Sequence, residues 1–265
     1  MTRWALLLEY DGAPFVGWQR QNTGRSVQDV LETAAAKLNR SQPVTSVVAG
    51  RTDAGVHAAG QVAQLDLPET ITAAQVRDAL NYHMKPYPVT VVVAAPAPEG
   101  WNPRFSAIGR VYCYRILNRR ARPALLAGRV WHVPVELDAE AMGRAAQSLC
   151  GRHDFTSFRA AACQAKSPLR TLDQLNVRRN GTLIEVVAEA RSFLHHQVRN
   201  IVGTLKLVGE GSWPVDRVAA ALAARDRSAA GPTAPPEGLC LTRIRYPVDP
   251  FGEVAQASAQ PLRNV

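Results

Sequence analysis

The sequence predicts an α+β protein made of two tandem ferredoxin-like β-α-β-β-α-β halves, with adjoining antiparallel sheets and a central groove. Three observations predict this class. Short apolar runs, some of them alternating with polar residues, are typical of strands. Longer runs with apolar residues three and four apart are typical of helices. The order of these runs in residues 1–105 recurs in residues 106–265, so we expect one domain in each range.

The first half begins with an apolar strand over residues 3–10, which Asp11 and Gly12 end. A helix follows over 27–38, because Ser26 is a typical N-cap and the apolar residues after it recur at helical spacing. The other predicted elements of this half are strands over 44–50, 60–67 and 89–95, and a helix capped by Thr72 over 71–80.

The second half repeats this order. Its first two predicted elements are a strand over 109–117 and a helix over 138–150. Strands over 172–179 and 182–190 are joined by Asn180-Gly181, a dipeptide that favours a tight hairpin because both residues tolerate positive φ. The remaining predicted elements are helices over 194–209 and 215–224 and a closing strand over 238–246.

The charge of the chain is distributed unevenly between its halves. The net charge is +9, and residues 1–108 contain nine basic and nine acidic residues, so the whole surplus lies in residues 109–265. Most of these cations are arginines, which bind phosphate in a bidentate fork. Concentration in one half favours a polyanionic partner over a merely solvated basic surface.

Several classes of protein are excluded by the sequence. No stretch approaches the ~20 apolar residues of a membrane helix, and the N-terminal apolar run is ended by acid and glycine without a cleavage site. We therefore expect a cytoplasmic protein without a membrane partner. The four cysteines are scattered and form no C-x-x-C pair, which favours reduced thiols over a zinc ribbon or a disulfide framework.

The segment VAGRTDAGVHAAG, residues 48–60, is unusual for a surface turn because it sets Asp53 two residues after Arg51 and between two glycines. A phosphate-binding loop is disfavoured, since neither Gly-Lys-Ser/Thr nor G-x-G-x-x-G is present. A metal site made by Asp53 and His57 is disfavoured too, because no third ligand and no known ligand spacing accompany them.

A positioned carboxylate is the third interpretation. Residues two apart in an extended chain face the same side, so the Arg51 guanidinium can hold Asp53 or a neighbouring phosphate. A nearby arginine keeps a carboxylate ionised, and an ionised carboxylate can act as a nucleophile or a general base. Flanking glycines let a substrate approach the backbone. A turn with a surface ion pair explains the same residues, so both interpretations stay open.

The predicted helix over 194–209 carries a polar stripe beside its apolar face. The stripe consists of His196, Arg199, Asn200 and Gly203. A glycine inside a helix costs about 1 kcal/mol, which indicates close packing or close approach of a substrate at Gly203. A solvated helix face is the alternative. Adjacent helical residues point ~100° apart, so we expect His195 and His196 to contact RNA or protein rather than share a metal ion.

Six blocks of the sequence, in order along nearly the whole chain, resemble the tRNA pseudouridine synthase A family. The blocks are EYDGAPFVGWQRQ with SVQDVLE, GRTDAGVHA, RFSA with RVYCYRI, GRHDFTSFRA, SFLHHQVRNIVGTL and EGLCLTRIRYP. Departures occur at 81–91, where the family usually has a shorter Leu-Pro-x-Asp-Ile turn, and at Asn102, where many members have histidine. These departures affect loop shape rather than the motifs expected to carry chemistry.

The resemblance implies isomerisation of uridine to pseudouridine in the anticodon arm of tRNA, at positions 38, 39 and 40. The base leaves its N1 glycosidic link, rotates, and rejoins the ribose through C5. The resemblance also implies a homodimer that uses neither a metal nor an organic cofactor. A non-catalytic RNA-binding protein and a metal-dependent RNA hydrolase are the alternatives from other classes.

The resemblance also assigns residues. Asp53 matches the essential aspartate, in the first domain, and Arg199 matches the arginine that pairs with it, in the second. Tyr112 matches the tyrosine that stacks on the target uracil, and an aromatic face holds a base at about 1–3 kcal/mol. Tyr114, two residues along the same strand, either shares this site or packs in the core. We further expect RNA contacts from Arg159, Lys166, Arg170 and His196, although a generic basic loop explains the first three equally well.

Overall fold

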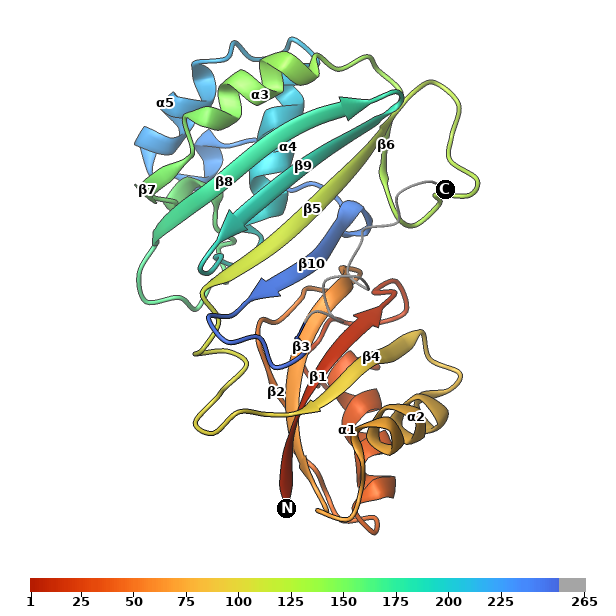
Figure 1. Cartoon of the computed structure of the whole chain (residues 1–265). Coiled ribbons are helices and arrows are strands. Elements are labelled where there is room, and N and C mark those ends of the chain that lie inside the picture. Colours follow the sequence, from red (N-terminus) through yellow and green to blue (C-terminus); the bar gives the residue numbers. More distant parts are fainter. Residues whose placement is uncertain (253–265) are drawn as a thin grey trace. The chain divides into compact units, whose positions relative to one another are not determined.

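The computed structural model describes residues 1–252, within which the chain is mixed α+β, with five α-helices and mostly antiparallel strands (Figure 1). The chain divides into two compact units, Met1–Ile108 with the chain from Leu241 onward, and Gly109–Cys240. The predicted boundary after residue 105 lies close to Ile108. The closing strand differs from the predicted division, because its residues from Leu241 onward group with the first unit.

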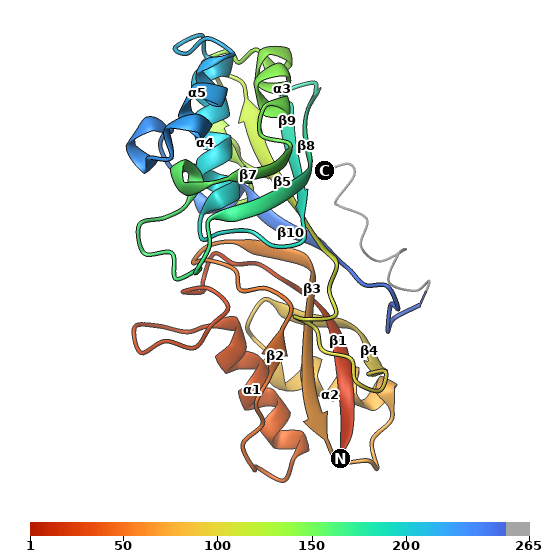
Figure 2. The same cartoon turned by 90° about the vertical axis from the view of Figure 1, so that its left-hand side faces the viewer.

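The first unit contains the element order β-α-β-β-α-β, followed much later in the chain by part of β10. The elements are β1 (Thr2–Tyr10), α1 (Val27–Leu38), β2 (Val47–Val48), β3 (His57–Leu67), α2 (Ala73–Met84), β4 (Val89–Pro96) and β10 (Leu239–Arg245). Strand β1 pairs with β3 and β4, and β2 pairs with β3, all antiparallel. Figures 1 and 2 show α1 and α2 against one face of these strands.

The caps predicted for both helices of this unit are confirmed. The Ser26 side chain accepts from the Asp29 N–H, and Thr72 forms a reciprocal capping box with Gln75. Strand β2 is much shorter than the predicted 44–50 run. Gly60 of β3 lies very close to the backbone of β10, since a Cβ on Gly60 would be 2.3 Å from the carbonyl oxygen of Thr242.

The second unit forms an antiparallel sheet in the order β5-β9-β8-β7, with β6 added to β5 in parallel. Its strands are β5 (Gly109–Asn118), β6 (Trp131–Val133), β7 (Gly151–Asp154), β8 (Leu169–Asn180) and β9 (Leu183–Ala190). Its helices are α3 (Ala139–Gln147), α4 (Gln197–Gly209) and α5 (Arg217–Ala224). Figure 2 shows these three helices on one face of the sheet.

The predicted hairpin between β8 and β9 is confirmed, but its turn lies one residue later than expected. Asn180 pairs with Leu183, so Gly181 and Thr182 are the two turn residues, and Gly181 has a φ of 57°. Glycine at the first central position meets the positive-φ requirement of a tight hairpin turn. Asn180 therefore ends the strand rather than forming the turn.

All four cysteines are free thiols, as predicted. Burial raises the pKa of Cys113 to about 12, with the nearby Glu185 carboxylate acting in the same direction, so this thiol stays protonated at neutral pH. Within residues 1–252, no helix combines the length and the apolar composition that crossing a membrane requires.

Candidate active site

The Asp53 loop, residues 50–56, connects β2 to β3 and is held at its start by two buried side chains. The Gln61 amide, on β3, donates to the Gly50 carbonyl at 2.7 Å. The hydroxyl of Tyr10, at the end of β1, hydrogen-bonds Thr52 Oγ1 at 2.8 Å. Gln61 is fully buried and Tyr10 and Thr52 nearly so. A buried hydrogen bond is costly to break, because each partner would be left without water, so these bonds fix the loop.

The β1–α1 connection holds the same loop from a second side. The Trp18 N–H donates to the Thr52 carbonyl at 3.0 Å, and the Gly55 N–H donates to the Phe15 carbonyl at 3.3 Å. Gly17 has a φ of 107°, and a Cβ there would lie 2.7 Å from the Thr52 carbonyl oxygen. The connection therefore needs glycine at position 17 to lie this close to the Asp53 loop.

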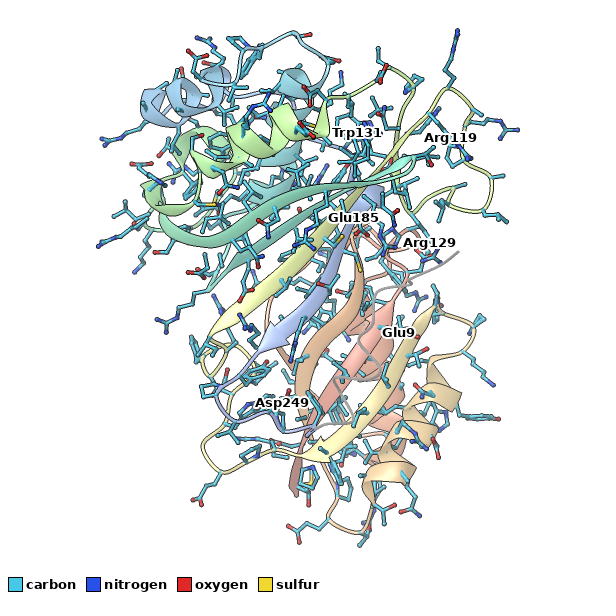
Figure 3. All side chains as sticks on the ribbon, turned by 45° about the horizontal axis from the view of Figure 1, so that its top comes forward. Glu9, Arg119, Arg129, Trp131, Glu185 and Asp249 are labelled. Carbon is cyan, nitrogen blue, oxygen red and sulfur yellow. The ribbon has the colours of Figure 1, made fainter. Side chains whose placement is uncertain are left out.

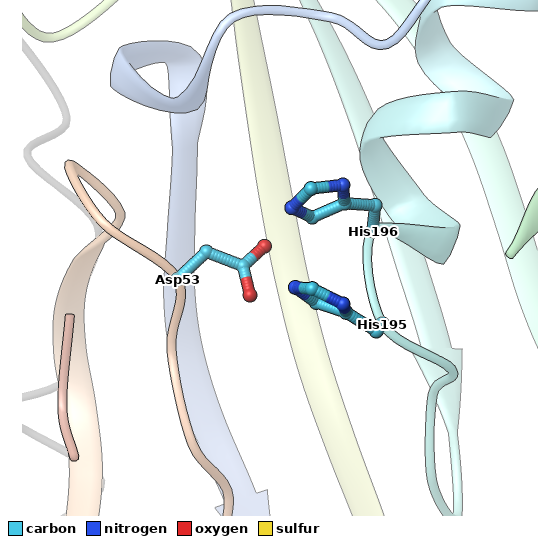
Figure 4. A group of neighbouring side chains, drawn as sticks. All are labelled: Asp53, His195 and His196. Carbon is cyan, nitrogen blue, oxygen red and sulfur yellow. The ribbon is translucent and has the colours of Figure 1, made fainter. Parts of the chain in front are cut away.

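Asp53 projects from this fixed loop with its carboxylate directed away from the backbone (Figure 4). Its side chain is half-buried, and that of Arg51 is exposed. The two glycines of the loop differ: Gly55 has a φ of 77°, whereas a Cβ on Gly50 would meet no atom within 4 Å. Gly55 is thus required by the backbone conformation, and the described structure gives no packing reason for Gly50.

His57 has a structural role at the end of the Asp53 loop. The Gly12 N–H donates to His57 Nδ1 at 3.0 Å, and Asp11 Oδ1 lies 3.1 Å from the same nitrogen. Both contacts are made by the Nδ1 edge of the ring, which therefore faces the residues that follow β1. The buried imidazole thus joins the Asp53 loop to the end of β1, which gives it a role other than the metal ligand considered above.

The Tyr10–Thr52 bond can be tested without reference to function. Tyr10→Phe should increase amide hydrogen exchange in the Asp53 loop and lower the free energy of unfolding by about 1–3 kcal/mol, because Thr52 Oγ1 is left buried without its partner. Tyr246→Phe is the matched control, since that hydroxyl donates to the Pro103 carbonyl at 2.7 Å in the same unit but away from this loop. Equal exchange in both variants would show that the Tyr10 hydroxyl does not hold the loop.

In the second unit, the two tyrosines of the β5 motif differ in environment. Tyr112 is half-buried, and its ring meets Phe193 edge-on, with centroids 5.3 Å apart. Tyr114 is completely buried, and its hydroxyl donates to the Pro235 carbonyl at 2.8 Å. Burial raises the pKa of Tyr114 strongly, although the nearby Arg199 cation opposes the shift. Of the two roles considered for Tyr114, a share in the site and packing in the core, the structure supports packing in the core.

Arg199 lies on α4 and is half-buried. Its Nε donates to the Ala234 carbonyl at 2.7 Å, and the Ala234 N–H donates back to the Arg199 carbonyl at 3.1 Å. These two bonds tie α4 to the segment 230–234 that precedes β10. The guanidinium is thus held at its Nε by a backbone contact within the second unit.

None of the residues of the polar stripe is exposed, since Asn200 and Gly203 are buried and the other two half-buried, so a solvated helix face is the wrong interpretation. Asn200 is completely buried, where its amide donates to the Phe158 carbonyl and its oxygen accepts from Arg227 and Thr233. A Cβ on Gly203 would lie 1.8 Å from the Pro232 carbonyl oxygen. Close packing against Pro232 therefore explains the glycine at position 203. Asn200 fixes the neighbouring segment through its bond to Thr233.

His195 and His196 lie before α4 rather than inside it, because the helix begins at Gln197 and not at residue 194 (Figure 4). His196 is the N-cap residue in the left-handed conformation, with a φ of 61°. Because neither residue lies inside the helix, the expected ~100° angle between side chains around a helix axis does not apply to them. Their ring centroids lie 4.0 Å apart, with 45° between the ring planes. His195 is exposed and His196 half-buried.

The three basic residues expected to bind phosphate are placed differently. Arg159 follows a short 3₁₀ turn, Thr156–Phe158, and is half-buried, whereas Lys166 is exposed. Arg170 folds back on its own loop, donating to the carbonyls of Ser167 and Leu169 at 3.0 and 2.6 Å. Burial lowers the pKa of Arg170, although a guanidinium stays charged at neutral pH. Arg170 therefore also shapes the loop.

Sequence reasoning missed the supporting residues, above all Gln61 and Tyr10 around the Asp53 loop and Arg227 around Asn200. For Gln61, the sequence contained one signal: it is a glutamine in a largely apolar strand, and a buried amide needs partners inside the protein. Nothing in the sequence pattern indicated the contact of Arg227 with Asn200, because the two residues lie on different segments of the chain.

Comparison with known proteins identifies the family. A family model described as tRNA pseudouridine synthase matches residues 7–106 and 145–247. A tRNA pseudouridine synthase A from Acidiphilium cryptum is 71% identical over 252 residues, which cover 95% of this chain and 99% of the relative. The enzyme of the same name from Paramagnetospirillum magneticum is 62% identical over 246 residues, covering 93% and 96%. The chain therefore belongs to the tRNA pseudouridine synthase family.

Proposed function

We propose that this chain is a tRNA pseudouridine synthase, an isomerase that converts uridine to pseudouridine in the anticodon stem-loop. The observation that carries the proposal is the match of the family model to both halves of the chain, together with relatives of that name at up to 71% identity. Family membership favours isomerisation over the two alternatives, a non-catalytic RNA-binding protein and a metal-dependent RNA hydrolase. At the finer level, we propose positions 38, 39 and 40 as the target uridines.

The reaction leaves the elemental composition of the nucleotide unchanged. The N1–C1′ bond breaks, the base rotates, and a C5–C1′ bond forms, while a proton leaves C5 and a proton is gained at N1. Such a reaction needs an ionised group aimed at a flipped-out nucleotide. We assign this role to Asp53, as the essential catalytic carboxylate acting either as nucleophile or as base. Its position on a loop held by buried hydrogen bonds supports the assignment.

The other site residues follow from the same proposal. Tyr112 stacks on the target uracil, and its edge-on contact with Phe193 fixes the plane of its ring. Arg199 pairs with Asp53 in the active state, and its bond to Ala234 supports a preorganised guanidinium. Arg51 assists Asp53 or binds a neighbouring phosphate. Arg159, Arg170 and His196 are assigned to RNA binding.

We also propose the finer architecture in which this chemistry occurs. Each unit is a ferredoxin-like half, the antiparallel sheets of the two halves adjoin, and the anticodon arm binds in a groove between them. The first half carries the Asp53 loop, and the basic second half carries Tyr112 and Arg199. Two such chains form a cytoplasmic homodimer, so a monomer in light scattering at working concentration would contradict this part of the proposal.

The test is a comparison of tRNA from cells with and without this protein. Chemical mapping should find pseudouridine at positions 38, 39 and 40 only when the protein is present. The purified protein should restore these modifications to undermodified tRNA, with full activity in excess chelator, because we assign no step to a metal or an organic cofactor. Strand cleavage that chelator abolishes, without pseudouridine formation, would favour the metal-dependent RNA hydrolase, and unchanged maps would refute the proposed targets.

A further inference from the structure

The loop between β5 and β6, residues 119–130, has an unusual charge. We call it the arginine loop: it contains Arg119, Arg120, Arg122 and Arg129, and the chain has no acidic residue from its start until Glu136. All four arginines are exposed, and Figure 3 shows Arg119 and Arg129 in the region of this loop. Exposed like charges repel one another, so such a cluster favours binding of an anion.

The base of the arginine loop is fixed by a buried asparagine. Asn118, the last residue of β5, donates to the carbonyls of Val133 and Val135 at 2.9 and 2.5 Å. Its side-chain oxygen accepts from the Leu137 N–H at 3.1 Å and from Arg179 at 2.8 Å. Asn118 is only 8% exposed, and all four of its amide bonding positions are used. The two ends of the loop are therefore locked together.

The interior of the loop is also ordered by local bonds. The Ala127 and Arg129 N–H groups donate to the carbonyls of Ala124 and Leu126, and the His132 ring nitrogen bonds the Arg119 carbonyl at 2.8 Å. A surface loop closed on itself and carried by a fixed sheet is a common position for binding residues. The backbone that carries its cations is ordered before any partner arrives, which lowers the entropy lost on binding.

Two of its cations have no internal role. Within residues 1–252, Arg120 and Arg122 form no ion pair, whereas Arg119 donates to the Ala121 carbonyl of its own loop. The loop uses arginine at every cationic position, and arginine is the residue that binds phosphate oxygens in pairs. A polyanion with regularly spaced phosphates is the partner whose chemistry these side chains match.

We propose that the arginine loop binds the phosphate backbone of tRNA outside the isomerised nucleotide. This inference rests on the proposed function for the identity of the RNA. Tyr112 and Asn118 lie on the same strand, and a strand rises about 3.3 Å per residue, so the loop begins about 20 Å from the ring assigned to the uracil. At that distance the loop holds the body of the substrate and takes no part in bond exchange.

The test uses the double variant Arg120→Gln/Arg122→Gln of the whole protein. Its matched control is Arg3→Gln/Arg77→Gln, which removes the same charge from exposed arginines paired with Asp66 and Asp78. Affinity for full-length unmodified tRNA is measured between 50 and 200 mM salt. Each lost phosphate contact should reduce the slope of log affinity against log salt by about 0.9. The slope of the double variant should therefore be lower by about 1.8, and its affinity near physiological salt should be about tenfold weaker.

The control variant should keep the slope, the affinity and the rate of pseudouridine formation of the unaltered protein. An unchanged slope in the arginine-loop variant would overturn the proposal. A change in oligomeric state at unchanged tRNA affinity would also overturn the proposal. The arginine loop, where Leu125 is 85% exposed, would then be a protein interface. Absence of pseudouridine formation by the unaltered protein would instead refute the proposed function.

Discussion

Asp53→Asn should reduce pseudouridine formation by about four orders of magnitude or more, while tRNA affinity changes by no more than a few-fold. Removal of a catalytic nucleophile or base costs on this scale, because the amide can neither attack nor accept a proton at neutral pH. The substitution keeps the shape of the side chain, and the bonds that Gly50, Thr52 and Gly55 make to neighbouring elements do not involve the substituted carboxylate. Binding should therefore survive.

Asp66→Asn is the matched control for this prediction. It removes one carboxylate from an exposed position on β3 in the same unit, where Asp66 pairs with Arg3. Turnover of the control should equal that of the unaltered protein. Normal isomerisation by Asp53→Asn, measured under single-turnover conditions, would show that another group performs the chemistry.

Gly203→Ala should damage both stability and activity. A Cβ at position 203 would lie 1.8 Å from the Pro232 carbonyl oxygen, so α4 and the segment 230–234 must separate. Overpacking of a buried site typically costs about 1–3 kcal/mol of unfolding free energy. The same separation breaks the contact of Arg199 with Ala234, and misplacement of a catalytic group by about 1 Å can lower the rate about 100-fold.

Gly143→Ala provides the comparison for Gly203→Ala. Gly143 lies inside α3, where a Cβ would meet only the Val177 Cβ at 3.9 Å. Alanine is the better helix former by about 1 kcal/mol, so this variant should be as stable as the unaltered protein or more stable, with unchanged activity. Chemical denaturation and turnover measured on both variants test the pair. Equal behaviour of the two glycines would contradict the packing role given to Gly203.

The sequence predicted elements best where local interactions decide them. Helix α1 has the predicted bounds, because Ser26 caps its first turn, and the Thr72 cap of α2 is present as expected. Predictions were less accurate where tertiary contacts decide the structure. Helix α4 begins at Gln197, three residues late, and β6 pairs with β5 over only three residues, too few for a periodic signal.

The candidate site shows the same division. Motif resemblance indicated Asp53, Tyr112 and Arg199, but alternation along a strand gives Tyr114 the same face as Tyr112, so it left the choice between a site role and core packing open for Tyr114. Burial of Tyr114 beside Pro235 and Gly238 depends on a segment more than a hundred residues away in the chain. Spacing on a helix likewise grouped Asn200 with a polar face, although its partners bury it completely.

Release of the C5 hydrogen is the most direct measure of the central claim, that Asp53 drives uridine isomerisation in the anticodon stem-loop. Transcripts carrying tritium at C5 of a single uridine, at position 38, 39 or 40, would be incubated with the purified protein and with Asp53→Asn. The unaltered protein should release the tritium while the RNA strand stays intact, and the variant should release almost none. Retention of the tritium by the unaltered protein, or release at equal rates by both, would contradict the account.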